Sequence, residues 1–335
     1  MRKILLLVLV FFFTSFFTAA QASDTDGLNG YSFSLGVSVG LLAGQSEEIL
    51  YISQNMDYKA SQLLWNMKPL IYASAELNYK FQLPVSNIRF FVNTQVKFGF
   101  PGNTGIMEDR DWTATPFYPD WLTHYSVQDN KTEKAILVDG KIGASFVVFE
   151  DFLIKPFVSY SLMMFSWVAS KGSYLYPSTD GGHFDYFDLY NAGDIGSPTA
   201  PVGTYRQTWH IISPGVSFYG KFNRYFDIEL FLRATPLAWC KAVDEHLLRN
   251  LVITDTMFGG LFLEPALLFS FKPNPKLSFS FSFAYRYING TRGDCVYTGD
   301  EVYTTYGVPS IKENDLSGTG YSVFDAGIFV KYNVF

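Results

Sequence analysis

The sequence lacks the motifs on which most metal and nucleotide sites depend. It has only 4 His and 2 Cys among 335 residues. No two His stand at i, i+2 or i, i+4 spacing and no HExxH motif occurs, so we expect no metal cofactor. There is also no GxSxG elbow, no P-loop and no GxGxxG fingerprint. These absences argue against a lipase-type serine hydrolase and against a nucleotide-binding fold.

Charged residues are also few, and basic residues are fewer than acidic ones. Charged residues make up 17% of the chain, with 25 Lys and Arg against 31 Asp and Glu. The resulting net charge of −6 argues against a nucleic-acid partner.

Long apolar runs are missing except at the start. Ile4 to Phe17 follow the basic pair Arg2-Lys3 and precede Ala20-Gln21-Ala22, which predicts a secretory signal peptide over residues 1–22. The alternative of a membrane anchor is disfavoured because this run is short. After it, no run reaches the ~18–20 apolar residues of a membrane helix. Removing the signal makes the net charge two units more negative and leaves residues 23–335, which we interpret as a single domain.

Aromatic residues are abundant, at 18% of the chain, and they alternate with small or polar ones. From Tyr31 to Leu41 one row is apolar and the other contains only Ser and Gly, and 276–287 and 324–335 alternate in the same way. Such a pattern fits either a secreted β-sandwich or an outer-membrane β-barrel. The recurring runs of ten or more residues favour the barrel, because sandwich strands average about 5–6 residues. A last alternating strand that ends in Phe335 also resembles the assembly signal of bacterial outer-membrane proteins.

The predicted fold is therefore all-β: a ten-stranded antiparallel transmembrane β-barrel with long extracellular loops. The expected strands are 29–44, 58–82, 87–105, 132–149, 152–171, 204–222, 225–243, 256–272, 276–290 and 319–335. The long connections are 45–57, 106–131, 172–203, 244–255 and 291–318, so every other connection is long. Short turns at the other rim, such as 83–87, match periplasmic turns.

Two short stretches contain most of the residues that could take part in catalysis. Asp109 and Asp111, and likewise Asp244 and His246, stand at i, i+2 spacing, which places each pair on one side of an extended strand. Both stretches fall near outer strand ends on the same rim. A carboxylate beside an imidazole, facing a pair of carboxylates, could activate a water molecule for hydrolysis. The plainer interpretation is that these are ordinary acidic loop residues.

The alternation of inward and outward residues along the strand conflicts with an inward position for Asp244 and His246. Extending the outward row of Ile228, Leu230 and Leu232 would turn Asp244 and His246 away from the lumen. Pro236 removes a ladder donor within that strand, and such residues commonly mark a bulge. We therefore predict a bulge between Thr235 and Lys241 that returns the pair to the inner face.

The two cysteines, Cys240 and Cys295, are expected near the same rim. In an oxidising compartment they could form a disulfide between neighbouring outer loops, or remain as free thiols.

The chain resembles the omptins, ten-stranded outer-membrane endopeptidases. The family's Asp-Xaa-Asp-Trp motif is matched at 109–112 and its Asp-Glu-His motif at 244–246. Further blocks agree in order: Ser61-Gln62-Leu63 followed by Trp65, Gly172-Ser173-Tyr174-Leu175-Tyr176, and Tyr205-Arg206-Gln207 with Pro214. Trp121 follows Trp112 at the family's spacing. The resemblance spans nearly the whole chain after the signal.

The resemblance implies a proteolytic groove at the extracellular mouth of a bacterial outer-membrane barrel. Asp244 would orient His246, His246 with Asp109 would hold and deprotonate the attacking water, and Asp111 would assist. The expected partners are peptide or protein substrates and outer-membrane lipid, including the lipopolysaccharide that omptins commonly require. No cofactor is expected beyond that lipid, and we expect a monomer.

Substrate-binding positions depart from the family pattern. Glu48 matches the acidic residue of the pocket for a basic side chain, but Ala242 stands where a second acidic residue is usual. Thr123 replaces another acidic residue, and Ser126 is kept while Gln128 replaces the His that would follow it. We therefore expect cleavage near basic residues with altered specificity. The alternatives are a catalytically inactive omptin-like barrel that serves as a surface adhesin or a structural protein, and a soluble secreted β protein.

Overall fold

The computed structural model describes residues 31–53, 58–82, 88–112, 121–177, 190–197 and 200–334. The predicted signal peptide, the predicted turn at 83–87 and His183 lie outside these residues. The strands are β1 (Tyr31–Tyr51), β2 (Lys59–Gln82), β3 (Arg89–Gly99), β4 (Gly102–Asp111), β5 (His124–Phe149), β6 (Phe152–Pro177), β7 (Tyr190–Ile195), β8 (Gly203–Lys221), β9 (Phe226–Thr235), β10 (Ala238–His246), β11 (Leu251–Phe258), β12 (Leu261–Asn274), β13 (Leu277–Gly299) and β14 (Ser310–Asn333). One short helix, α2 (Asp300–Tyr306), separates the last two strands.

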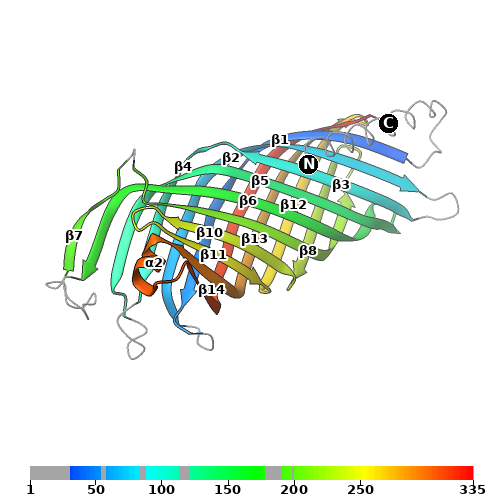
Figure 1. Ribbon diagram of the computed structural model, residues 1–335. Helices are drawn as coiled ribbons and strands as arrows, with labels where there is room; N and C mark the ends of the chain where they lie inside the picture. The colour runs from blue at the N-terminus through cyan, green and yellow to red at the C-terminus, as the bar shows by residue number, and fades with distance from the viewer. Residues whose placement is uncertain are drawn as a thin grey trace, which may run out of the picture.

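These strands form one closed antiparallel ring (Figure 1). Val37 of β1 pairs with Ala75 of β2 on one side and with Val330 of β14 on the other, so the first and last strands are joined. From β2 the ring continues through β3 together with β4, and then through β5, β6 and β8. It continues through β9 together with β10, then β12 together with β11, and β13 pairs with β14. The predicted all-β antiparallel barrel is confirmed. The number of strands is higher than predicted, because three predicted strands are each divided in two and β7 is an additional strand that pairs with β6.

The hairpins project further at one end than the sequence indicates. β5 begins at His124 rather than near 132, β6 ends at Pro177 rather than near 171, and β13 ends at Gly299 rather than near 290. Parts of the predicted loops 106–131, 172–203 and 291–318 are therefore strand. The hydrogen-bonded ladder continues there, whereas the apolar alternation ends because both faces of a projecting hairpin have left the apolar layer.

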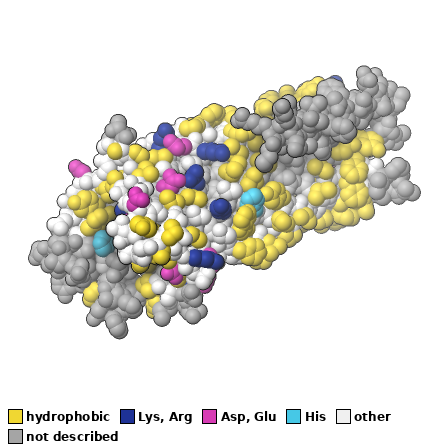
Figure 2. All heavy atoms as spheres, viewed as in Figure 1, with side chains coloured by type: hydrophobic (Ala, Val, Ile, Leu, Met, Phe, Trp, Pro, Cys, Tyr) yellow, Lys and Arg dark blue, Asp and Glu magenta, His cyan; other side chains and the backbone are white. Residues whose placement is uncertain are grey.

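The two rows of each strand have the polarity of a membrane barrel. Val37 and Val39 face outward and are 62% and 59% exposed, whereas Ser34 and Ser38 face inward and are buried. A soluble sandwich would bury the apolar row instead, so the secreted-sandwich alternative is wrong. Figure 2 shows apolar side chains over one half of the visible outer surface and charged side chains gathered over the other. Among the described residues, no helix has both the length and the apolar character needed to cross a membrane.

The apolar outer band ends below the candidate site. On β10 the outward row changes from exposed Trp239 to exposed Lys241, and on β11 it changes from exposed Phe258 to exposed Thr256. Trp239 and Phe258 are a cross-strand pair, so both mark the same height on the barrel. The segments beyond them stand outside the membrane. α2 and β7 also lie at this end, away from the chain terminus marked C (Figure 1).

The predicted bulge at Pro236 is confirmed. Gly215 of β8 pairs with Arg233, and Ile211 of β8 pairs with Ala238. The two β8 residues are four positions apart, whereas their partners are five positions apart. One extra residue therefore lies between β9 and β10. Before it Leu230 and Leu232 are exposed and Arg233 is buried, whereas after it the buried residues are Ala238, Cys240, Ala242 and Asp244. The bulge turns the end of this strand so that its even-numbered residues face inward.

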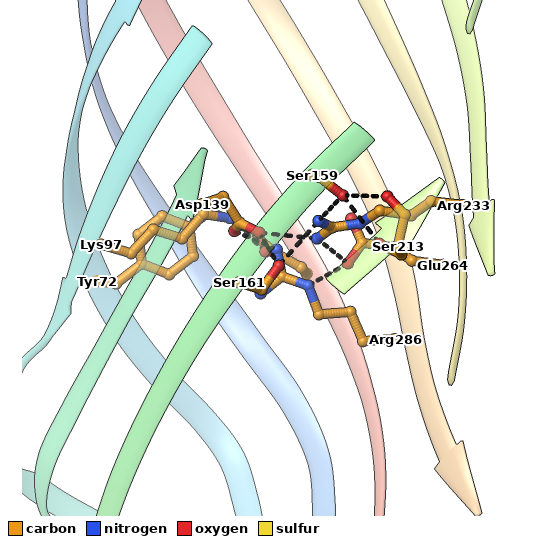
Figure 3. Close-up of polar contacts among 10 residues, drawn as sticks. Tyr72, Lys97, Asp139, Ser159, Ser161, Ser213, Arg233, Glu264 and Arg286 are labelled. Atoms are coloured by element: carbon orange, nitrogen blue, oxygen red, sulfur yellow. Dashed lines mark hydrogen bonds and ion pairs between the residues drawn. The ribbon is translucent and has the colours of Figure 1, made fainter. Parts of the chain in front are cut away.

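Charged side chains on the inner face form a network of ion pairs and hydrogen bonds in the interior of the barrel (Figure 3). Arg233 Nη2 lies 2.8 Å from both Asp139 Oδ1 and Glu264 Oε2, and Arg286 forms ion pairs with the same two carboxylates. Tyr72 donates to Asp325 at 2.7 Å, and Lys97 pairs with that carboxylate. All of these side chains are buried. We call the set Asp139, Arg233, Glu264 and Arg286 the lumen ion cluster.

Candidate active site

Asp109 and Asp111 end β4 on its inner face. They share the row of buried Met107, and their cross-strand neighbours on β5 are Ser126 and His124. Asp111 also accepts a hydrogen bond from the side chain of Ser61 on β2. One carboxylate oxygen of Asp109, Oδ1, is buried without a hydrogen-bond partner. The pair is thus held between two strands, and one buried carboxylate oxygen is left as a free acceptor.

Asp244 and His246 end β10, between β8 and β11. Asp244 is 3% exposed, and its Oδ2 lies 2.6 Å from His246 Nε2. Because Asp244 engages Nε2, the Nδ1 atom of His246 is the ring nitrogen available to act on water. This contact fixes the orientation of the imidazole ring.

The two pairs act on each other electrostatically across the mouth. Burial and the Asp111 carboxylate raise the pKa of Asp109 well above its ordinary value, while His246 acts to lower it. Burial also raises the pKa of Asp111, against the effect of the Ser61 hydrogen bond. Burial alone would lower the pKa of His246, but Asp244 outweighs it, so that pKa is raised. The carboxyl pair therefore titrates jointly and retains a proton at higher pH than isolated side chains would.

A cluster of buried acidic side chains lies beside Asp244. Glu48 on β1 is 7% exposed, and burial together with Asp244, Asp255 and Asp109 raises its pKa well above the ordinary value. Ala242 is fully buried on the same row as Asp244. Its cross-strand neighbour on β11 is Asp255, which is 3% exposed. The sequence analysis did not single out Asp255, although its alternation with buried Leu251 and Met257 places it on the inner row.

Stacked aromatic rings and a hydrogen-bond network lie beside this cluster and form what we call the floor of the site. The Trp65 and Tyr205 rings are stacked with centroids 5.4 Å apart, and Trp167 stacks on Tyr205 at 5.9 Å. Beneath them, Gln207 accepts from Ser46 at 2.6 Å across the lumen and donates to Thr319 at 2.7 Å. The floor is therefore a packed surface that joins strands from opposite sides of the ring.

Thr123 and Ser126 have local structural partners. Thr123 donates to the backbone carbonyl of Asp111 through its hydroxyl, at 3.0 Å, and through its amide, at 2.8 Å. Ser126 is buried and accepts a hydrogen bond from Gln128 at 2.8 Å. Thr123 and Ser126 thus support the strand ends that hold the carboxyl pair.

The disulfide alternative is wrong, because both cysteines are free and buried. Cys240 on β10 pairs with Met257, whereas Cys295 on β13 pairs with Asp255, so β11 runs between them. Two strand spacings amount to about 9–10 Å. A disulfide requires Cα atoms within about 7 Å.

The remaining described histidines lie outside the paired groups. His124 is tilted against Tyr176, with ring centroids 5.1 Å apart. His210 packs against Trp239 on the outer wall and lies 2.6 Å from the Tyr160 hydroxyl. Among the described residues, no group of three or more His, Cys, Asp or Glu has an arrangement that could hold a metal ion.

Comparisons with known proteins agree with this architecture. The chain is 24% identical to the plasminogen activator of Yersinia pestis over 246 residues, which are 73% of this chain and 72% of that protein. It is 21% identical over 286 residues to outer membrane protease OmpP of Escherichia coli (strain K12), covering 83% of this chain and 84% of that protein. The crystal structure of outer membrane protease OmpT from Escherichia coli superposes with a TM-score of 0.78 at 17% identity, covering 92% of this chain and 99% of that one. That superposition shows a shared fold.

The family assignment comes from the length of the chain that matches one family model. The model described as the Omptin family matches residues 29–334, which include every strand of the barrel and both candidate catalytic pairs. This protein therefore belongs to the omptin family of bacterial outer-membrane proteins.

Proposed function

We propose that this protein is an endopeptidase that hydrolyses peptide bonds at the extracellular mouth of its barrel. The observation that carries the proposal is the 2.6 Å contact between Asp244 and His246, electrostatically coupled to the Asp109–Asp111 pair. An oriented imidazole next to a carboxyl pair of raised pKa is suited to general acid–base chemistry. Relatives called a plasminogen activator and an outer membrane protease support the same class of reaction.

In the first step, a water molecule lies between His246 and Asp109. His246 takes one proton from the water through Nδ1 as the water oxygen bonds to the peptide carbonyl carbon. The carbonyl π electrons move to its oxygen, giving a tetrahedral intermediate. Asp244 stabilises the imidazolium that forms, and Asp109 orients the water through its unpartnered oxygen.

In the second step, the intermediate collapses and the carbon–nitrogen bond breaks. The leaving amine takes the proton held by His246, which restores the neutral imidazole. Asp111, next to Asp109, keeps a proton within the carboxyl pair and limits its negative charge. Acid–base assistance of this kind contributes about 10²–10⁴-fold to a rate.

The substrate preference follows from the acidic cluster beside Asp244. Glu48 supplies negative charge there, and we propose cleavage next to basic residues with a preference altered by the departures at Ala242 and Thr123. Lipopolysaccharide is proposed as a lipid on which activity depends, in line with the family resemblance.

The test uses full-length protein inserted in lipid vesicles, with and without lipopolysaccharide, and an internally quenched peptide that contains Arg. Wild-type protein is expected to hydrolyse the peptide, and His246→Ala and Asp109→Ala are expected to reduce kcat below detection. Migration on a gel before and after heating checks that each variant barrel is closed. Asp294→Asn, on β13 and paired with Lys312 outside the site, serves as the control. A folded wild-type barrel that binds peptides without cleaving them, under either lipid condition, would instead favour the adhesin alternative.

A further inference from the structure

The acidic cluster beside Asp244 contains three buried carboxyl groups with little positive charge around them. Glu48, Asp244 and Asp255 are all less than 8% exposed. Within the described part of the chain, the ion pairs include no Lys or Arg bound to any of the three, and His246 is the one cationic partner, on Asp244. Burying carboxylates without counter-charge is costly. A cationic ligand would remove that cost.

Two carboxylate oxygens are available to such a ligand. Glu48 Oε2 and Asp255 Oδ1 are buried and have no hydrogen-bond partner. Asp255 accepts a hydrogen bond from Ser317, which holds the carboxylate and leaves Oδ1 unpaired. Glu48 and Asp255 act on each other electrostatically although they come from β1 and β11, so both belong to the acidic cluster on the inner face.

The register shows how Asp255 reaches this place. It is the direct cross-strand neighbour of Ala242, and both residues are on the inner face. Side chains opposite each other on antiparallel strands have Cβ atoms about 4.5–5.5 Å apart. Because Ala242 ends at its methyl group, the Asp255 carboxylate can occupy the space next to it. The charge missing at position 242 is thus present on the adjoining strand.

The aromatic floor beside the acidic cluster suits a long cationic side chain. Asp255 and Glu48 both act electrostatically on Tyr205, whose ring stacks on Trp65. Aromatic faces pack well against the methylene stem of Arg or Lys and attract the charged end. Among the residues that the structure describes, these side chains do not form a metal site.

We propose that Asp255, acting with Glu48, is the specificity-determining residue that binds the basic side chain next to the scissile bond, replacing the charge absent at Ala242. This rests on the proposed endopeptidase function. It also refines the expectation that the departure at Ala242 alters the specificity. The acidic residue is on β11 rather than on β10, and the preference for a guanidinium or ammonium group is retained.

The first experiment compares hydrolysis of two peptides that differ only by Arg or citrulline at the cleavage site. Citrulline keeps the size and hydrogen-bonding ability of Arg but has no charge. Wild-type protein is expected to favour Arg, and Asp255→Asn should reduce the ratio of kcat/KM values by about 10- to 100-fold, as expected for losing a charged hydrogen bond. The double variant Asp255→Asn/Ala242→Asp, which returns a carboxylate to β10, should recover most of the ratio. Asp294→Asn removes an outward carboxylate from β13 and should leave the ratio unchanged.

A second experiment separates this proposal from the proposed activity. In the His246→Ala background, binding of N-acetyl-argininamide and N-acetyl-citrullinamide is followed by tryptophan fluorescence, with Asp255 intact or changed to Asn. Arg-selective binding that depends on Asp255 would support the pocket even if wild-type protein hydrolysed nothing, in which case the endopeptidase function alone would fail. Hydrolysis or binding with an Arg-to-citrulline ratio unchanged by Asp255→Asn would overturn the pocket, as would a double variant that regains no selectivity.

Discussion

His246 and Asp244 lie two residues apart on the inner face of β10, with Nε2 and Oδ2 separated by 2.6 Å. This contact fixes which ring nitrogen of His246 faces the carboxyl pair. The contact joins a buried carboxylate to a partly exposed imidazole. The Asp244 side chain is 4% exposed and that of His246 is 28% exposed.

Replacing Asp244 with Asn should reduce kcat by about 10²–10⁴-fold, with a smaller change in KM. The amide keeps the size of the side chain but no longer stabilises the imidazolium. Steady-state kinetics with a quenched peptide measure the effect. If Asp244→Asn left kcat within a factor of two of wild type, Asp244 would have no part in orienting His246.

The pH profile of kcat/KM should report the raised pKa of His246. Neutral imidazole is the form that accepts a proton, so activity is lost as pH falls through that pKa. Because Asp244 raises the pKa, the acidic limb should lie above the ~6.5 of an unperturbed imidazole. Asp244→Asn should move that limb to lower pH. A limb that stays in place in this variant would mean that another group controls it.

Selectivity for Arg over citrulline should rise with pH around neutrality. Burial and the Asp244 carboxylate raise the pKa of Asp255 to about 7, against a lowering hydrogen bond from Ser317. The carboxyl group is therefore largely neutral below that pH and attracts a cation only above it. The change should be seen as a pH-dependent ratio of kcat/KM values that is flat in Asp255→Asn.

The other titratable groups that interact electrostatically with Asp255 do not favour its ionised form. It is coupled to Glu48 from β1, Tyr205 from β8, Cys240 from β10, and Cys295 and Tyr297 from β13. None of these carries positive charge in any protonation state. A bound Arg side chain should consequently extend the ionised range of Asp255 to lower pH.

Removing one cation from the lumen ion cluster should destabilise the barrel. Arg233→Met leaves Asp139 and Glu264 with Arg286 as their remaining partner in the cluster, and losing one member of a buried ion pair costs about 3–5 kcal/mol. The temperature at which the folded band disappears on a gel should fall. Lys221→Met, which breaks an exposed pair with Asp151, is the matched control and should leave that temperature nearly unchanged.

The sequence predicted the barrel and the inner position of both candidate catalytic pairs because these depend on period-two alternation and on Pro236. It underestimated the length of β5, β6 and β13, since alternation disappears once a hairpin stands in water on both faces. It also missed Asp255. Cross-strand proximity to Ala242 depends on the hairpin register between β10 and β11, and spacing within one strand contains no information about that register.

The lumen ion cluster has a consequence for where the products go. The buried side chains of this cluster link strands across the interior of the barrel (Figure 3), so we expect a peptide to enter and leave at the mouth, toward the cell exterior. Both fragments of a cleaved chain must leave through the opening by which the substrate entered. The proposed proteolysis would therefore deliver nothing to the periplasm, and the outer membrane would keep its permeability barrier during the reaction.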